Sequence, residues 1–376
     1  MRPLLPRELV QLLAEGDLTL IVTYQHSGGT VSDSHRLRLR EVSRLYTSAR
    51  RGCESYDGPV LHTLVPDPAT LADVLPTDRL LPNGMAIPEI RRELRRISNL
   101  RNFKAVLASW TLLMSLVWLG TRGPWWLTIL AMLAMGPLHV RFAILMHEAA
   151  HKLLFSRKSL NDLIGTWLIA YPALVPLSAY RRGHFAHHKE EFGPNEPDIA
   201  FYRGYPGTRA DLRRRLIRDA VGISGAKNLR FLFLATTKAS SRRVALSIIA
   251  VQVAMAVGLW LVTGRWWAYF VLWLAPWMTQ WRVLNRLRAI AEHGGMQQSD
   301  DRRLTTHHVR QSLLARIWLV PFNTGWHLAH HVDMGVPWHQ LPAFHDELVR
   351  AGYVTEDITF ASYRDLWRAA TAGSLS

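Results

Sequence analysis

Three histidine clusters are the parts of this sequence whose residue types and spacing could do chemistry. Two clusters place histidines at positions i, i+3 and i+4, and a third places a pair at i and i+4. On a helix, these spacings bring the imidazoles to one face, about one turn apart. With one further single candidate, the set is His147, His151, His184, His187, His188, His293, His327, His330 and His331.

Metal binding is the chemistry that these clusters favour. A single short motif of this kind also occurs by chance on a polar helix face. Three clusters, each at the end of an apolar stretch, are hard to explain in that way. Imidazole is a good ligand for zinc, copper, iron and nickel. One tetrahedral ion takes about four ligands, so nine of the 17 histidines predict two metal ions that share one site.

Composition narrows the possible partners. The net charge of +16 would suit a nucleic acid, but it equally suits anionic lipid beside apolar helices, and the apolar segments favour lipid. We therefore expect no nucleic-acid partner. The single cysteine, Cys53, excludes an internal disulfide and a cysteine-held zinc or iron–sulfur site. The first residues lack the apolar stretch of a signal peptide.

Four apolar segments are the elements that could position the clusters. They fall into two pairs with a Trp pair at each bend, and each segment is close to the ~20 residues that a membrane-spanning helix needs. Buried helices of a soluble protein seldom form such matched hairpins. We therefore predict an all-α integral membrane protein with four transmembrane helices in two hairpins, at residues 104–120, 124–146, 244–263 and 266–283.

The distribution of Lys and Arg predicts the orientation in the membrane. Each bend carries one arginine, Arg122 or Arg265, whereas many arginines lie between the two hairpins. By the positive-inside rule, the bends face away from the cytosol. The apolar stretches 163–179 and 313–322 should not span the membrane, because prolines break the first and the second is too short. Every histidine cluster then lies in a helical cap on the cytosolic side.

Residues outside the clusters carry weaker signals. His139 and Arg141 lie within the second apolar segment and should face the bundle interior, where we expect a packed structural role. The first 84 residues hold no cluster, and we expect a strand near 18–24, a helix near 34–51 and no part in catalysis. The predicted divisions are an N-terminal extension (1–84), a catalytic domain (85–348) and a C-terminal tail (349–376).

The order of the three clusters around two hairpins resembles the membrane fatty-acid desaturase superfamily. Further matching positions are Asp198, the E-H-G-G stretch at His293 and the V-P-W-H-Q-L-P-A-F-H stretch that ends at His345, so the resemblance covers about residues 87–348. It implies a non-haem di-iron centre, held by the nine histidines, that activates O2 and removes hydrogen from an unactivated acyl chain. Ala329 departs from the pattern, since many bacterial relatives have Glu there.

Three other histidines receive different interpretations. His307 and His308 lie outside the family pattern, and we expect them at the protein surface. His345 fits the pattern, but as a structural group or as a support for the ligands. Metal-bound imidazoles also need a partner for their second ring nitrogen, and the nearby acidic candidates are Glu148, Asp198, Glu292 and Asp333.

The resemblance implies an oxidoreductase that introduces a double bond into a lipid acyl chain, with no catalytic residue apart from the metal ligands. Hydroxylases and ketolases of fatty acids or carotenoids share the clusters and are the alternative. A zinc metalloprotease is a more distant alternative. His147, Glu148 and His151 match its H-E-x-x-H signature, but that interpretation leaves both H-x-x-H-H clusters unexplained.

The electrons for such a reaction should come from another protein. The chain has no cysteine set for an iron–sulfur cluster and no Gly-rich dinucleotide fingerprint between a strand and a helix. We therefore expect a separate electron donor, either a ferredoxin or cytochrome b5 with its reductase. An acidic donor would be steered to the basic cytosolic face.

Overall fold

A computed structural model of the chain describes residues 64–74, 78–194 and 196–373. Most of these residues are helical, and the described part holds one two-stranded sheet, in which β1 (His308–Val309) and β2 (Thr359–Phe360) pair in parallel. The helical fold class is therefore confirmed. The strand expected near 18–24 and the helix expected near 34–51 lie outside the described residues.

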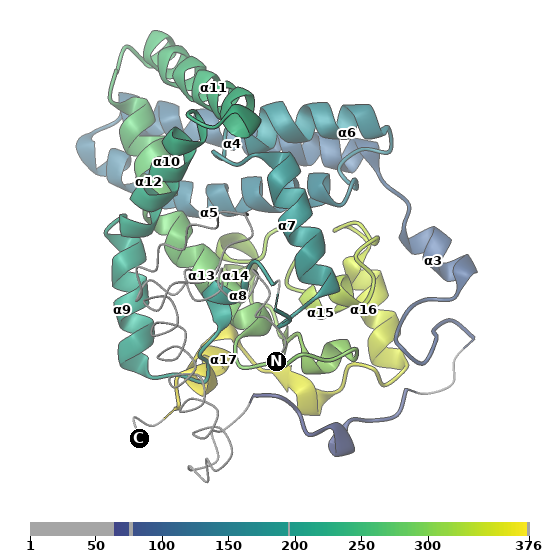
Figure 1. Cartoon of the computed structure of the whole chain (residues 1–376). Helices are drawn as coiled ribbons and strands as arrows, with labels where there is room; N and C mark the ends of the chain where they lie inside the picture. The colour runs from purple at the N-terminus through teal and green to yellow at the C-terminus, as the bar shows by residue number, and fades with distance from the viewer. Residues whose placement is uncertain (1–63, 75–77, 195, 374–376) are drawn as a thin grey trace, which may run out of the picture. The chain divides into compact units, whose positions relative to one another are not determined.

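Three stretches of the described chain are long and apolar enough to cross a membrane. They are Pro88–Arg122, which holds α3 (Pro88–Leu94) and α4 (Asn99–Arg122), then α5 (Trp125–Ala150) and α11 (Ala239–Thr263). α5 lies at the centre, since 67% of its most apolar part is buried, against 17% for α11. Figure 1 shows α5 between α4 and the helices that carry the later histidines.

The first predicted hairpin is present as α4 and α5. Gly123 joins the two helices, and a Cβ there would lie 2.4 Å from Cδ1 of Leu127, so a larger residue would require the Leu127 side chain to move. Along the hairpin, Leu113 of α4 belongs to one buried cluster with Met135 and Phe142 of α5. In a bilayer, close van der Waals packing of such side chains holds two helices together, so the contact between these faces stabilises the pair.

The fourth predicted segment, 266–283, is not one continuous helix. It forms a π-helical turn (Phe270–Leu274), the short α12 (Ala275–Met278) and the start of α13 (Gln280–His293), with a break at Thr279. Pro276 has no backbone N–H to continue a helical ladder. Trp273 and Trp277 are nevertheless 0% and 3% exposed. Among the described residues, three long apolar stretches are therefore found where four were predicted.

The apolar stretch 163–179 is broken, as its prolines predict. It holds the end of α6 (Lys158–Ile164), a π-helical turn (Gly165–Ala170) and the start of α7 (Leu177–Lys189). Between them, the carbonyls of Pro172 and Ala173 accept the indole N–H groups of Trp273 and Trp277 at 3.1 and 2.8 Å. Backbone groups outside a helix thus find partners inside the protein. In Figure 1, α7 then runs toward the short helix that carries the third histidine cluster.

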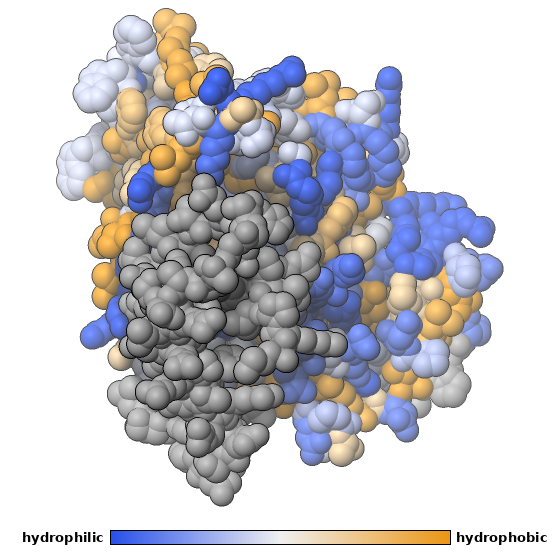
Figure 2. All heavy atoms as spheres, in the orientation of Figure 1, coloured by the Kyte–Doolittle hydropathy of each residue, from blue (hydrophilic) through white to orange (hydrophobic). Residues whose placement is uncertain are grey.

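Shorter helices make up the rest of the described chain. They are α8 (Ile199–Tyr202), α9 (Arg209–Ala220), α10 (Ile223–Ala235), α14 (Leu313–Trp318), α15 (His327–Val332), α16 (Leu341–Arg350) and α17 (Tyr363–Ala370), with 3-10 turns at Pro68–Thr70, Arg302–Leu304 and Glu356–Ile358. Phe231 and Phe233 of α10 are 65% and 59% exposed. Figure 2 shows apolar residues gathered over α10 and α11, as is typical of helices that lie in or against a membrane.

The described residues just before Met85 pack on the C-terminal part of the chain. Leu80 is 5% exposed and belongs to one cluster with Phe344 and Leu348 of α16. Arg79 pairs with Glu347 of the same helix at 2.9 Å. These contacts tie the end of the predicted N-terminal extension to the element that follows the third histidine cluster.

Candidate metal centre

Four elements bring the nine predicted histidines together. α5 supplies His147 and, at its C-terminal cap, His151, while α13 ends at His293. The other two clusters lie on α7 and α15, which are short helices beyond the long apolar ones. All nine side chains meet where the ends of α5 and α13 face α7 and α15.

The histidine side chains form two neighbouring sets. In the larger set, five ligand atoms lie within 4.8 Å of one another, from His147, His151, His184, His188 and His330. In the smaller set, His187, His293 and His331 meet the same limit. Nε2 of His327 completes it, 3.0 Å from Nε2 of His331 and 3.2 Å from Nε2 of His293. Two sets of this size suit two metal ions.

Helical phase divides each H-x-x-H-H cluster between the two sets. Residues i and i+4 lie about 40° apart around a helix, whereas i+3 lies about 60° from i in the other direction. In α7, His184 and His188 therefore join the larger set and His187 joins the smaller one. In α15 the division is reversed, with His330 in the larger set. Each of these helices thus serves both sets.

Buried carboxylates orient two of the rings. Nδ1 of His331 lies 2.5 Å from Oε1 of Glu191, and Nδ1 of His187 lies 2.9 Å from Oε2 of Glu196. Both carboxylates are buried. An imidazole that donates through Nδ1 keeps a lone pair on Nε2, and such a partner fixes the ring for a metal.

The smaller set fits a cation better than a hydrogen-bonded cluster. His293 donates through Nδ1 to the backbone carbonyl of Thr305 at 2.9 Å, so His293 and His331 both present Nε2 lone pairs. Both lone pairs face Nε2 of His327, at 3.2 and 3.0 Å. A neutral imidazole has at most one N–H at that atom, so one buried acceptor stays unsatisfied, which costs free energy. A metal ion among these nitrogens would satisfy all of them.

The acidic partners differ from those considered in the sequence. Glu148 and Glu292 approach Nδ1 of a histidine only to 3.6 and 3.8 Å. Asp333 instead pairs with Arg91 at 2.9 Å, and Asp198 lies beside the pair of His187 and its carboxylate. The residues at hydrogen-bond distance, Glu191 and Glu196, follow the second cluster within eight positions. Carboxylates directly after a histidine cluster were the signal that could have found them.

Burial keeps most of these imidazoles neutral. Burial and the neighbouring histidines lower the pKa of His184 and His188 well below the ordinary value. His187 differs, because burial lowers its pKa but the hydrogen bond to Glu196 outweighs that effect and raises it. Neutral imidazole is the form that binds a metal, so the larger set is prepared for an ion at neutral pH.

The surface position predicted for His307 and His308 is wrong, since they are 4% and 7% exposed. Nε2 of His307 donates to the carbonyl of Gly294 at 2.8 Å, directly after His293. The ring of His308 stacks on that of His345, with 4.6 Å between centroids. Their position outside the family pattern led to the surface prediction, but both residues of β1, to which His308 belongs, are buried. These contacts support the structural role expected for His345.

His139 and Arg141 have the packed surroundings that the sequence predicts. Nε2 of His139 lies 3.0 Å from the carbonyl oxygen of Trp273, and His139 is 2% exposed. The guanidinium of Arg141 lies over the ring of Phe322, 4.3 Å from its centroid. Both side chains therefore connect α5 to other elements of the fold.

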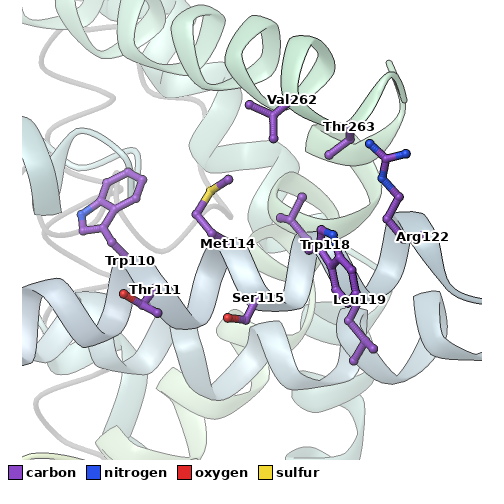
Figure 3. A pocket seen from close by; sticks show the side chains of 10 residues that line it. Trp110, Thr111, Met114, Ser115, Trp118, Leu119, Arg122, Val262 and Thr263 are labelled. Carbon is purple, nitrogen blue, oxygen red and sulfur yellow. The ribbon is translucent and has the colours of Figure 1, made fainter.

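Two cavities differ in their relation to the histidines. A groove of about 840 Å³ runs between α4 and α11, lined mainly by apolar groups such as Trp110, Met114 and Trp118 (Figure 3). None of the nine histidines lines this groove. A smaller cavity of about 80 Å³ borders His147, so a group bound there lies next to the larger histidine set.

Several known proteins are similar in sequence to this chain. A sequence model of the family described as fatty acid desaturase matches residues 124–364. Dihydrorhizobitoxine desaturase of Bradyrhizobium elkanii is 27% identical over 229 residues, 57% of this chain and 65% of that protein. The chloroplastic omega-6 fatty acid desaturases of Brassica napus and Arabidopsis thaliana are 25% and 24% identical over 316 residues, 78% of this chain and 68% and 67% of those proteins.

The matched range contains every member of both histidine sets, together with Glu191 and Glu196. The chain spans about two thirds of the length of the curated relatives it matches. The family match covers more than half of the chain, and each of these relatives is named a desaturase. The chain therefore belongs to the fatty acid desaturase family and is an oxidoreductase.

Proposed function

We propose that this protein is an O2-dependent di-iron desaturase that introduces a double bond into a lipid acyl chain. The observation that carries the proposal is the pair of imidazole sets in a chain of this family. Imidazole suits iron, and a C–H bond within an alkyl chain has no acidic proton for a side chain to remove. Bound iron would supply, with O2 as the oxidant, the oxidising power that such a bond requires.

The reaction balances with one external source of two electrons. Two C–H bonds on neighbouring carbons break, and a C=C bond forms. O2 accepts four electrons, two from the substrate and two from the donor, and with the two substrate hydrogens and two protons from solvent it becomes two molecules of water. We propose that a ferredoxin, or cytochrome b5 with its reductase, delivers these two electrons.

The residues of the chain hold and orient the centre. The proposed iron ligands are His147, His151, His184, His187, His188, His293, His327, His330 and His331. Glu191 and Glu196 fix the rings of two ligands, and the backbone carbonyl of Thr305 fixes a third. Arg302 donates to Glu191 at 2.8 Å and keeps that carboxylate in place. Because most of these groups are buried, bulk water is kept away from the reacting carbon.

The proposed membrane arrangement has four passes in two hairpins, with the broken segment 266–283 as the fourth pass. Three long apolar stretches support it, as does the burial of Trp273 and Trp277 in the segment itself. The histidines lie at the opposite ends of the helices from the bends at Gly123 and Gly264. The positive-inside rule then puts the site on the cytosolic face. The apolar groove between α4 and α11 has the lining that an acyl chain binds.

The alternatives receive less support. Hydroxylation or ketolation of a fatty acid or carotenoid would use the same histidines, but the similar proteins carry desaturase names. The zinc metalloprotease is disfavoured because His147 and His151 share their set with three histidines from other helices. In addition, Glu148 accepts the backbone N–H of Trp338 at 3.2 Å.

Expression in a host of known lipid composition tests the proposal. Mass spectrometry of the lipids should show new unsaturated acyl chains that are absent when the His187→Ala variant is expressed. New hydroxylated chains without new double bonds would assign a hydroxylase, and changed carotenoids with unchanged acyl chains would assign the terpenoid branch. One zinc ion per chain, with no iron and no oxidised product, would overturn the proposal.

A further inference from the structure

The cavity of about 80 Å³ beside His147 has an unusual lining for a site that handles hydrocarbon. Its apolar wall comes from α5 and α13 and includes Ile144, Met146 and Trp281. Its polar side carries Tyr180, Asn285, Arg288 and Thr324, from three separate parts of the chain. A volume of this size holds a small group of atoms rather than a whole acyl chain.

Arg288 lines this cavity and has a hydrogen-bond donor without a partner among the described residues. One terminal nitrogen of its guanidinium donates to Oε1 of Glu292 at 2.7 Å, and the side chain is 12% exposed. The Nε atom is buried and has no partner among the described residues. A buried N–H without an acceptor costs free energy, and an alkyl chain laid against it would leave that cost in place. A ligand that brings an oxygen atom would remove it.

The side chains of the cavity match a neutral oxygen better than an anion. Arg288 and Glu292 are already paired with each other, so neither offers a free charge to a phosphate or a carboxylate. Asn285, one helical turn before Arg288 on α13, adds an amide that can donate or accept. A carbonyl or hydroxyl oxygen matches these two side chains.

We propose that this cavity binds a carbonyl or hydroxyl oxygen of the substrate and so places the double bond close to that oxygen. The inference rests on the proposed desaturase function and names the position of attack. An extended chain advances by about 1.2 Å per bond and the cavity is only a few ångströms across, so we expect the new double bond within about six bonds of the oxygen. The methylene groups between the oxygen and the double bond would then pack against the apolar wall formed by Ile144, Met146 and Trp281.

The position of new double bonds in the host lipids tests this inference. All unsaturated compounds that appear on expression should carry the double bond near an ester, amide, acid or hydroxyl group. Double bonds in the middle of long chains, far from any oxygen, would overturn the inference and leave the proposed function standing. If no unsaturated compound of any class appears, the proposed function itself fails.

Variants of the polar wall give a second test in the same host. Asn285→Leu keeps the size of the side chain and removes its hydrogen bonds, and Arg288→Lys keeps the charge beside Glu292 and removes Nε. Each should lower the yield of unsaturated product about tenfold, the effect of one lost hydrogen bond to a bound group, with the iron content per chain unchanged. Asn228→Leu, at an exposed position of α10, is the matched control. Yields for Asn285→Leu equal to those of this control would overturn the inference.

Discussion

Each histidine of α7 or α15 belongs to one of the two imidazole sets, although each helix serves both. His330→Ala removes a ligand from the larger set, and His327→Ala removes one from the smaller set. We predict that each variant binds about one iron per chain instead of two and loses desaturation, while its expression level stays near that of the wild type. Elemental analysis of the purified proteins measures this. Loss of both ions in each variant would contradict two separable sites.

The carboxylate of Glu196 should matter for metal affinity, although it lies outside the ligand set. It accepts from Nδ1 of His187, and partners of this kind typically contribute 10–100-fold in metal affinity or activity. Glu196→Gln should therefore weaken iron binding by about that factor, measured by titration with a chelator. Glu89→Gln, on the exposed face of α3, is the matched control. Equal iron affinity in both variants would argue against the role.

The stacked pair of His308 and His345 predicts a pH dependence of stability. Burial lowers the pKa of His308 to about 3 from an ordinary value of 6.5, and burial also lowers the pKa of His345. Between pH 3 and pH 6.5, the unfolded chain binds more protons at His308 than the folded chain does. The contribution of a neutral, buried His308 to the free energy of unfolding is therefore complete above pH 6.5 and is lost as the pH falls. For one such group, the free energy of unfolding at pH 5 is lower by about 2 kcal/mol than at neutral pH.

The thermal unfolding midpoint of the purified protein should therefore fall between pH 7.5 and pH 5. The buried ligand histidines act in the same direction, so the informative quantity is the difference between wild type and His308→Phe. The variant keeps a stacked ring that does not titrate, and its midpoint should fall less. The same fall in both proteins would show that His308 does not contribute.

At the level of residues, the sequence predicts that the nine histidines come together, but it does not predict which carboxylates lie beside them. The nine histidines follow a fixed helical spacing, so their common face could be predicted before any contact was known. Glu191 and Glu196 belong to the chain after α7, where the backbone path and not a periodic pattern decides which carboxylate meets which ring. His307 was misplaced for the same reason, since its burial depends on a turn that folds back onto Gly294.

Among the elements, the segment before α3 allows a test of where the catalytic domain begins. None of the described residues before Met85 lies in either histidine set, so a chain that begins at Met85 should still bind iron and desaturate. It would lose the burial of Leu80 against α16, which is worth about 1.5–3 kcal/mol. We therefore predict activity with an unfolding midpoint several degrees lower. A folded but inactive protein would show that residues 1–84 have a role in catalysis.

The helices were predictable where one periodic pattern decides the structure. The pair α4 and α5 follows directly from two apolar runs around Gly123 and Pro124. The segment 266–283 has a similar composition but contains Pro276, and its path depends on Trp273 and Trp277 reaching carbonyls about a hundred residues earlier in the chain. Hydropathy does not predict such contacts, so the break at Thr279 could not be predicted from the sequence.

In the molecule as a whole, basic and apolar surfaces meet beside the third long helix. Arg213, Arg214 and Arg218 are exposed on α9, and the exposed phenylalanines of α10 follow directly in the chain. At the start of α11, Arg242 and Arg243 line a groove with Leu246. A basic rim beside an apolar face is typical of the cytosolic boundary of a membrane protein, and it also gives an acidic electron donor a surface to approach.

The basic surface could bind anionic lipid or attract an acidic electron donor, and the choice of lipid around the protein distinguishes these two roles. In a bilayer of neutral lipid, the arginines have no anionic headgroups to bind, and attraction to an acidic ferredoxin or cytochrome should remain. We predict that turnover with an added donor and reductase then slows as the salt concentration rises, because ions screen the steering of an acidic partner over about 10 Å at 0.1 M salt. Arg213→Gln with Arg214→Gln should weaken that salt dependence. Turnover that does not depend on salt would show that the basic surface binds lipid and does not steer the donor. Turnover with NADPH and the purified chain alone would exclude a separate donor.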